Sequence, residues 1–347
     1  MIEQLTFAEA LLQAADQALA IDPNVLVMGL GVPDPKGIFG TTTGLQNKYG
    51  KERVLDIPCS ENGMTGIAIG AAILGMRPIL THQRVDFALL SLDQIINNAS
   101  KWHYMFGGEM KVPLVIRLII GRGWGQGPQH SQTLHSLFAH IPGLKVVMPS
   151  SPYDAKGLLL SAIADDNPVI FIEHRWLHNI HGPVPKEMYT VPLGKGKILQ
   201  EGTDVTIVAA SHMTIEAYRA LPLLKEQGIS AELIDLRSIL PFDKDMILQS
   251  VRKTGRLVVA DPDWKTGGFA AEVITSVVET TLLKCPPQRV CYPDRLIPSS
   301  PALAEHFYPS FMHLASTVLQ MMGCDPLPEQ VRAAFSDVPD KSFTGPF

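Results

Sequence analysis

Charged residues are scarce in this 347-residue sequence. They make up 18% of it, against roughly a quarter in an ordinary soluble domain. The formal net charge is −5, and no basic run is present that would indicate a nucleic acid or an anionic membrane surface as partner. Hydrophobic residues reach 46%. This surplus fits a large core, a large subunit interface, or both.

Cysteine is sparse as well. Its four residues contain no C-x-x-C pair, so the sequence indicates neither a zinc site nor a disulfide framework. The opening residues MIEQLTFAEA have no cationic stretch typical of a signal peptide. The longest run of apolar and small residues, 66–76, is shorter than the roughly 20 residues that span a bilayer. We therefore expect a cytoplasmic protein.

Short helical patterns alternate along the chain with wholly apolar strands. Strands are expected at 24–32, 53–57, 78–82, 112–120, 145–149, 168–174, 204–211, 230–239 and 256–262. Helices are expected at 6–20, 42–50, 63–76, 90–106, 132–140, 152–164, 213–227, 244–253, 269–283 and 301–322. Alternation of this kind predicts an α/β fold with parallel sheets covered on both faces. Every residue of the run 63–76 is predicted to be buried.

A proline-bearing stretch divides this alternation into two parts. We predict a first domain over residues 1–185, a linker over 186–197, and a smaller α/β domain over 198–347. Two glycine-rich loops, 29–37 and 121–129, have neither dinucleotide-binding nor P-loop spacing. They are interpreted as ordinary turns, and a nicotinamide dehydrogenase is poorly supported.

Two titratable residues follow predicted strands at the edge where parallel sheets bind ligands. Glu61 follows strand 53–57, and His130 follows strand 112–120. If Glu61 is sealed from water, burial favours the neutral acid, which can then donate a proton near neutral pH. If it is open to water, it is an ordinary acidic residue at a helix N-terminus. A lone histidine is more often structural than catalytic, so position alone leaves these alternatives open.

Several ordered motifs over roughly residues 3–320 resemble the β subunit of the thiamine-diphosphate-dependent 2-oxoacid dehydrogenases, the E1 component, most of all its pyruvate type. The motifs occupy 53–79, 86–108, 129–159, 166–174, 204–217, 231–243 and 253–261. The resemblance implies a pyrimidine-binding domain of transketolase type, followed by a smaller transketolase-like C-terminal domain.

The resemblance also implies roles for three side chains. In that family the glutamate of the S-E-x-G segment hydrogen-bonds the aminopyrimidine of thiamine diphosphate, an aromatic residue packs on the same ring, and a histidine lies near the substrate. The matching residues are Glu61, Phe87 and His130. A carboxylate suits the first task because it moves a proton at little geometric cost.

The resemblance also implies two metal sites, for which the sequence gives weaker signals. A monovalent cation, usually potassium, would be bound by backbone carbonyls of Leu114, Ala162, Asp165 and Asn167. The Gly-Asp-Gly motif that holds Mg²⁺ and diphosphate is missing from the sequence. In the family it belongs to a separate α subunit, so the resemblance implies an α2β2 heterotetramer, and a lipoyl-bearing E2 as a further partner.

Some positions depart from the family pattern. Gly29-Leu30-Gly31 replaces an acidic pair, which puts the associated proton network in doubt. His82 and Arg84 stand where members of the family are mostly apolar or aromatic, and Arg122 and Trp124 stand in a loop usually lined by small residues. Arg175 and the histidine-rich segment 174–181 add further cationic groups. Such residues either bind a larger anionic or sugar-like substrate or face solvent or the partner subunit. The first alternative gives the hypothesis that the substrate is not simply pyruvate.

Three functions follow from the sequence. The leading prediction is the β subunit of a 2-oxoacid dehydrogenase that decarboxylates a 2-oxo acid, transfers the acyl group to lipoamide, and is active only with an α subunit. The alternative is a split transketolase-like or carboligase enzyme with an aldehyde or sugar acceptor. A non-catalytic partner-binding scaffold is the third, and the intact Glu61, Phe87 and His130 argue against it.

Overall fold

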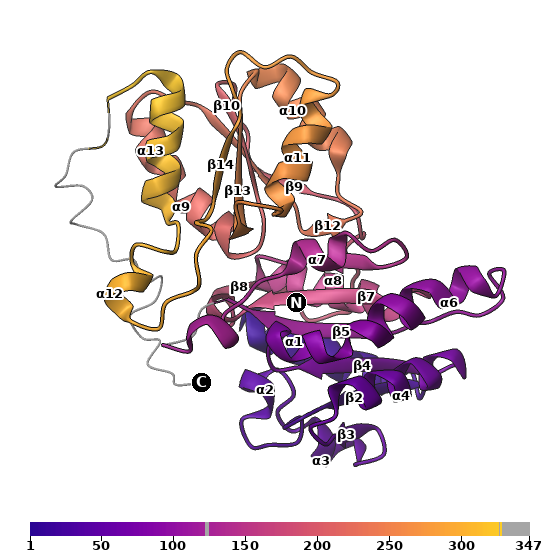
Figure 1. Ribbon diagram of the computed structural model, residues 1–347. Coiled ribbons are helices and arrows are strands. Elements are labelled where there is room, and N and C mark those ends of the chain that lie inside the picture. Colours follow the sequence, from indigo (N-terminus) through magenta and orange to yellow (C-terminus); the bar gives the residue numbers. More distant parts are fainter. Residues whose placement is uncertain (122–124, 326, 328–347) are drawn as a thin grey trace. The chain divides into compact units, whose positions relative to one another are not determined.

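The computed structural model describes residues 1–121, 125–325 and 327. They form two compact units (Figure 1). The first unit comprises Met1–Gly121, His130–Leu193 and Ile239–Pro241. The second unit comprises the described residues within Arg122–Gln129, Gly194–Ser238 and Phe242–Phe347. Arg122 and Trp124, singled out in the sequence, lie outside the described residues.

A seven-stranded sheet forms the centre of the first unit, in the order β12-β6-β7-β5-β4-β2-β3. Its strands are β2 (Val25–Gly29), β3 (Val54–Asp56), β4 (Arg77–His82), β5 (Val115–Ile120), β6 (Lys145–Val147), β7 (Val169–His174) and β12 (Ser238–Leu240). From β2 to β7 the strands run parallel. Every residue of β5 and β7 is buried, as expected for strands covered on both faces.

Helices connect these strands. They are α1 (Phe7–Ile21), α2 (Gly37–Gly40), α3 (Leu45–Tyr49), α4 (Glu61–Ile73), α5 (Val85–Ala88), η1 (Leu89–Ser91), η2 (Gln94–Ala99), α6 (Ser100–Met105), α7 (His135–Ala139), α8 (Pro152–Ala164) and η4 (Arg175–Leu177). α1 begins with a reciprocal cap, in which Glu9 N donates to Thr6 Oγ1 at 3.1 Å and Thr6 N donates to Glu9 Oε2 at 2.7 Å. None of the helices that the structure describes combines the length and apolarity needed to cross a membrane.

The predicted single helix 90–106 is divided. η2 has π-helical turns, and α6 follows it directly. Side chains in this segment bond locally: Ser100 Oγ donates to Ile96 O at 2.7 Å, and Asn97 Nδ2 donates to Asp93 Oδ1 at 2.8 Å. The bond of Ser100 to a backbone carbonyl competes with the regular α-helical pattern. Hydrophobic periodicity alone did not reveal them.

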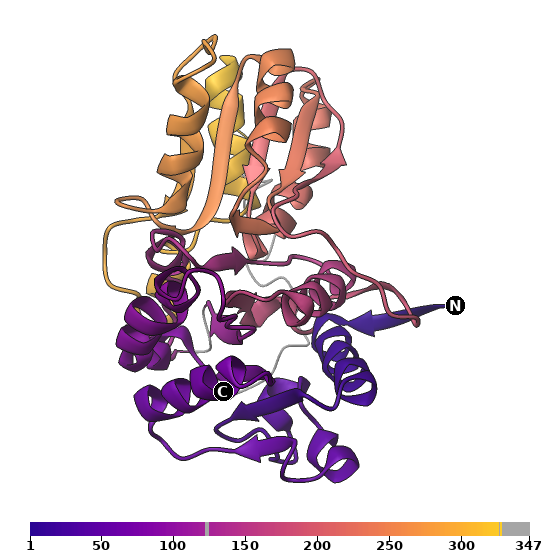
Figure 2. The same ribbon diagram turned by 90° about the vertical axis from the view of Figure 1, so that its right-hand side faces the viewer.

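A two-stranded antiparallel ribbon was not anticipated. β1 (Ile2–Thr6), the strand at the N-terminus in Figure 2, pairs with β8 (His181–Pro185). In this pairing Ile2 lies opposite Pro185. β8 contains two prolines, which cannot donate hydrogen bonds and are therefore confined to edge strands such as this one. Part of the proline-bearing stretch 182–197 is thus a strand.

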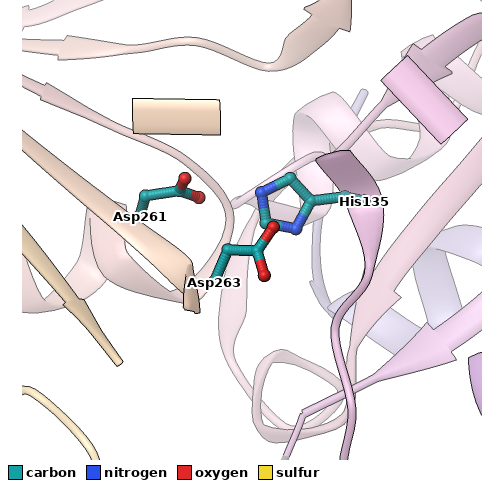
Figure 3. Close-up of side chains that lie close together, drawn as sticks. All are labelled: His135, Asp261 and Asp263. Atoms are coloured by element: carbon teal, nitrogen blue, oxygen red, sulfur yellow. The ribbon is translucent and has the colours of Figure 1, made fainter. Parts of the chain in front are cut away.

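The second unit has its own sheet, in the order β14-β13-β10-β11-β9. Its strands are β9 (Lys197–Gln200), β10 (Val205–Ala209), β11 (Ala231–Asp235), β13 (Leu257–Trp264) and β14 (Gln288–Tyr292). Only β9 runs antiparallel to its neighbour among the pairs in this sheet. Asp261 and Asp263 are buried side chains two positions apart on β13, and Figure 3 labels both, together with His135 of α7 in the first unit.

Helices cover both faces of this second sheet. Figure 1 shows α9 (His212–Glu226) and α13 (Phe311–Met322) on one side, and α10 (Lys244–Thr254) and α11 (Phe269–Val278) on the other. The predicted helix 301–322 is interrupted: α12 (Pro301–Ala304) ends early, and α13 begins after Pro309 with a cap from Ser310. Proline cannot continue a helix from the preceding turn, which accounts for the break.

Candidate cofactor and substrate site

Glu61 is the first residue of α4, which begins two residues earlier than predicted. Its side chain is half-buried, and among the described residues its carboxylate has no hydrogen bond or ion pair. The expectation that the run after Glu61 is fully buried is wrong for this chain, because Ile67 is 59% exposed and Leu74 is 86% exposed. One side of α4 packs inward, and the other is open.

A pair of hydroxyl contacts joins α4 to the segment that carries Phe87. Thr65 Oγ1 donates to Glu61 O at 2.7 Å and lies 2.9 Å from Ser91 Oγ. Ser91 closes η1, which follows α5 and its Phe87 without a break. Glu61 and Phe87 therefore lie on neighbouring, bonded segments of the first unit.

Phe87 and His130 are in contact. Their ring centroids are 5.4 Å apart at an interplanar angle of 83°, an edge-to-face arrangement. Next to them, Gln132 Nε2 donates to Asp86 Oδ1 at 2.7 Å. Sequence reasoning missed Asp86 and Gln132, although one adjoins Phe87 and the other stands two residues after His130.

Asp86 has a perturbed titration. Burial raises the pKa of its carboxyl group, and the bond from Gln132 and the charges of Arg84 and His130 oppose that rise without cancelling it. Its Oδ2 is a buried atom with no hydrogen-bond partner in the part of the chain that the structure describes. A carboxyl group shifted in this way beside a histidine is typical of functional sites.

These residues suit an aminopyrimidine ring. Glu61 offers an unengaged carboxylate at a helix start, Phe87 offers an aromatic surface, and His130 offers a second proton-carrying group. The observation that carries the fit is that Glu61 has no partner within the described residues, although it lies beside the segment of Phe87.

Two arginines lie near one aromatic ring. The guanidinium carbon of Arg84 is 5.7 Å from the centroid of Phe39, and that of Arg175 is 4.5 Å from it. Arg84 Nη1 also donates to Gly121 O at 3.3 Å. Arg84 is 4% exposed, so it does not face solvent in this chain. The sequence had singled out both arginines but not Phe39.

A buried ion pair joins strands β5 and β7. Arg117 Nε donates to Glu173 Oε1 at 2.8 Å, and His178 Nε2 lies 3.0 Å from Glu173 Oε2. Burial alone would raise the pKa of Glu173, but the charge of Arg117 and the bond from His178 outweigh burial and lower it. All three side chains are almost completely buried. We interpret the group as a structural support for the carboxyl edge of the sheet.

The residues of the predicted potassium site are engaged in backbone bonding. Leu114 O accepts from Val169 N at 2.9 Å, Ala162 O accepts from Asp165 N at 3.3 Å, and Asp165 O accepts from Arg77 Nη1 at 3.2 Å. Asn167 bonds the side chain of Asp165, which is also paired with Lys145. A carbonyl oxygen has a second lone pair, so potassium at these residues stays a prediction.

Comparisons with known proteins agree with the resemblance. Residues 3–179 match the family model "Transketolase, pyrimidine binding domain", and residues 194–314 match "Transketolase, C-terminal domain". The chain is 42% identical to the acetoin:2,6-dichlorophenolindophenol oxidoreductase subunit beta of Cupriavidus necator, over 93% of this chain and 98% of that one. It is 43% identical to the pyruvate dehydrogenase E1 component subunit beta-2, mitochondrial, of Oryza sativa subsp. japonica, over 85% and 80% of the two chains.

A solved structure supports the fold. The structure titled "Split gene transketolase, inactive beta4 tetramer" superposes with a TM-score of 0.76 at 23% identity and covers 92% of this chain and 98% of that one. At this identity the likeness concerns architecture alone. The predicted α/β class and the predicted family are both confirmed. The chain therefore belongs to the transketolase-type β subunits, the family of the pyruvate dehydrogenase E1 and acetoin oxidoreductase β subunits.

Proposed function

We propose that this chain is the β subunit of a thiamine-diphosphate-dependent dehydrogenase that decarboxylates a 2-oxo acid, passes the acyl group to lipoamide, and acts only with an α-type partner. The observation that carries the proposal is the placement of Glu61. In a chain that is 42% identical to a β subunit over 93% of its length, this residue has no partner among the described side chains and lies beside the segment of Phe87.

Each residue has a physical task in this proposal. Thiamine diphosphate, when bound, supplies a carbon nucleophile for the keto carbon of the substrate. Glu61 would accept and share a proton at the pyrimidine nitrogen, and Phe87 would pack on the same ring. His130 would hold or move a proton near the substrate, oriented by its contact with Phe87. Asp86 and Gln132 would hold the local geometry.

The partner follows from what the chain lacks. Without a Gly-Asp-Gly motif, we infer that Mg²⁺ and the diphosphate are bound by an α-type subunit, in an α2β2 assembly. The open side of α4, with Ile67 and Leu74, is consistent with such a partner. A lipoyl-bearing E2, potassium at the backbone carbonyls named above, and a cytoplasmic location belong to the same proposal.

A second candidate reaction has specific support. The relative from Cupriavidus necator and a second one from Bacillus subtilis, 40% identical, are both named as acetoin:2,6-dichlorophenolindophenol oxidoreductase subunit beta, and each matches over 93% of this chain. Cleavage of an acyloin would use the same Glu61, Phe87 and His130. The transketolase-like alternative has only the fold in its favour.

Reconstitution tests the proposal. The chain is co-purified with the α-type protein encoded beside it, and thiamine diphosphate and Mg²⁺ are added. Reduction of 2,6-dichlorophenolindophenol is then followed with pyruvate, branched 2-oxo acids and acetoin.

Glu61→Gln should lower kcat by about 100-fold or more, since general acid–base groups contribute roughly 10²–10⁴-fold. Glu52→Gln, at an exposed position of the same unit, is the matched control. Unchanged turnover in the Glu61 variant would instead favour the scaffold alternative.

A further inference from the structure

We propose that His82, the last residue of β4, hydrogen-bonds a hydroxyl group of the substrate and thereby selects a hydroxylated donor over an apolar one. This inference rests on the proposed function and deepens it, because it names the class of substrate that the same site takes. The tasks given above to Glu61, Phe87 and His130 leave His82 without a role.

The sheet order places His82 between the strands that precede the two candidate proton-carrying residues. β4 lies between β5, which precedes His130 in the chain, and β2, whose other neighbour β3 precedes Glu61. These four strands are parallel and therefore end at one carboxyl edge. The chain passes from β2 to β3 on one side and then to β4 on the other side of β2, so the strand order reverses between β2 and β4. Ligands of open α/β sheets bind at such a reversal.

The imidazole ring of His82 is enclosed but not satisfied. It is 4% exposed, and Nε2 is a buried atom without a hydrogen-bond partner among the residues that the structure describes. A buried polar atom left without a partner costs free energy, and such atoms are few in native proteins. Bulk water does not reach Nε2, so a group that offsets this cost has to be a bound one.

The protonation state of His82 favours a hydroxyl group as that partner. Burial lowers the pKa of His82 from 6.5 to about 4, so the ring is neutral at neutral pH. In a neutral imidazole one nitrogen donates and the other accepts, whereas a hydroxyl group does both and can satisfy Nε2 in either tautomer. A carboxylate only accepts, and it would bring a charge beside a ring that carries none.

The segment that begins at His82 leads directly into the candidate site. Next to His82, Gln83 Nε2 donates to Leu30 O at 2.9 Å, so the loops on both sides of the reversal are bonded to each other. Phe87 follows five residues after His82, and its ring contacts that of His130. A donor whose reacting end lies by His130 would therefore have its remaining groups beside this segment.

Kinetics with the reconstituted complex test the contact. Two pairs of donors that differ only by a hydroxyl in place of a methyl group are compared: 3-hydroxypyruvate with 2-oxobutyrate, and 4-hydroxy-2-oxobutyrate with 2-oxopentanoate. In at least one pair, His82→Phe should lower the ratio of kcat/KM for the hydroxylated donor to kcat/KM for the apolar donor by at least about 10-fold, because a bond to a buried group is lost. His82→Gln should keep most of the ratio, since its amide retains a polar group near the position of Nε2.

Thr81→Val is the matched control. Thr81 precedes His82 on β4, and its Oγ1 is also buried and without a partner in the described part of the chain. Side chains of successive strand residues point to opposite faces of the sheet, so this variant should keep the parent's ratio. The melting temperature at pH 7 verifies that each variant is folded. An equal fall of the ratio in Thr81→Val would indicate a general disturbance of β4 and would overturn the contact.

A binding measurement separates this inference from the proposed function. Glycerate and 2-hydroxybutyrate differ by the same exchange of a hydroxyl for a methyl group, and neither is a 2-oxo acid that can be decarboxylated. Isothermal titration calorimetry gives their Kd values for the complex of the parent and of His82→Phe. If no donor is turned over, a preference for glycerate that His82→Phe removes still supports the contact, and the proposed function alone fails.

The opposite result is equally well defined. Ratios of kcat/KM that are the same in the parent and in His82→Phe, for both pairs of donors, overturn the contact and leave the proposed function intact. Where no donor is turned over, an unchanged ratio of the two Kd values overturns the contact as well.

Discussion

His82, at the end of β4, is a buried residue whose ionisation opposes folding. It is 4% exposed, and its Nε2 has no hydrogen-bond partner in the described part of the chain. Burial lowers the pKa of His82 from 6.5 to about 4. The unfolded chain therefore binds this proton near pH 6.5, and the folded chain only near pH 4. Above pH 6.5 His82 is neutral in both states and does not lower the free energy of unfolding. As the pH falls from 6.5 towards 4, protonation of the unfolded chain lowers that free energy by about 3 kcal/mol in all.

His82→Phe removes this proton linkage. The phenyl ring fills a similar volume and leaves no unsatisfied nitrogen, so the variant should be as stable as the parent at pH 7 and more stable at pH 4.5. Urea unfolding at the two pH values measures the difference. His140→Phe, at an exposed position, is the control and should keep the parent's pH dependence. An acid-induced loss of the same size in His82→Phe would show that another group is responsible.

Gly121 closes β5 in a conformation that only glycine fits. Its φ is +87°, and a Cβ there would lie 2.1 Å from His174 Nε2. Gly121→Ala should therefore cost the strain of a left-handed residue, about 1–2 kcal/mol, plus a further 1–3 kcal/mol from overpacking. Gly44→Ala is the matched control, because Gly44 has φ +76° but nothing within 4 Å of the added methyl. Equal losses of unfolding free energy in the two variants would contradict the clash.

At the scale of elements, Lys156 binds helix α8 to strand β8. Its side chain is fully buried, and Nζ lies within hydrogen-bond distance of four oxygens: Gln13 Oε1 at 2.8 Å and the carbonyls of Pro185, Lys186 and Glu187 at 2.7, 3.1 and 2.9 Å. A buried ammonium group is tolerated only with such complete pairing. The helix and the edge ribbon are thereby joined by one side chain.

Lys156→Met keeps the length of this side chain and removes its donors. The surrounding oxygens lose the three N–H donors of the ammonium group, so the free energy of unfolding should fall by about 2–4 kcal/mol. Chemical denaturation measures the change. Lys51→Met, at an exposed position of the same unit, should stay within about 0.5 kcal/mol of the parent. A loss as small in the Lys156 variant would mean that water replaces the ammonium group.

Sequence patterns predicted the buried elements better than the exposed ones. β5 and α8 were predicted because they are strongly apolar and bounded by turn or capping residues. β9 and β14 were missed, because β9 has no buried residue, β14 has only two, and both lie at an edge of their sheet. Their pairing depends on neighbours distant in the sequence, and local periodicity does not report such neighbours.

The residues of the candidate site also fall into those that the sequence predicted and those that only the fold brings together. Glu61, Phe87 and His130 were predicted from motifs, and the structure brings Phe87 and His130 into contact. Phe39 could not be found, because its place beside Arg84 and Arg175 depends on a strained loop and on three strands that meet only in the fold. Asp86 could have been named as a candidate from the sequence, since it adjoins Phe87. Its bond to Gln132 is a tertiary contact, which the sequence does not show.

At the scale of the whole molecule, the proposed function implies that the chain carries only part of what thiamine diphosphate needs. In the proposed function it would offer a carboxylate and an aromatic ring for the pyrimidine, whereas its sequence has no Gly-Asp-Gly segment for Mg²⁺ and diphosphate. A charged diphosphate needs a bound cation or several donors to leave water favourably. Binding by the chain alone would therefore lose the interactions of the most strongly charged part of the cofactor.

We expect thiamine diphosphate with Mg²⁺ to bind the two-chain complex at least 100-fold more tightly than it binds this chain alone, since each 1.4 kcal/mol of lost interaction is tenfold in affinity. Isothermal titration calorimetry of both samples measures the ratio, and light scattering should give the complex the mass of two copies of each chain. Glu61→Gln should weaken binding to the complex, whereas Glu52→Gln should not. Equal affinity for the isolated chain would place the diphosphate site within this polypeptide and remove the need for the α-type partner.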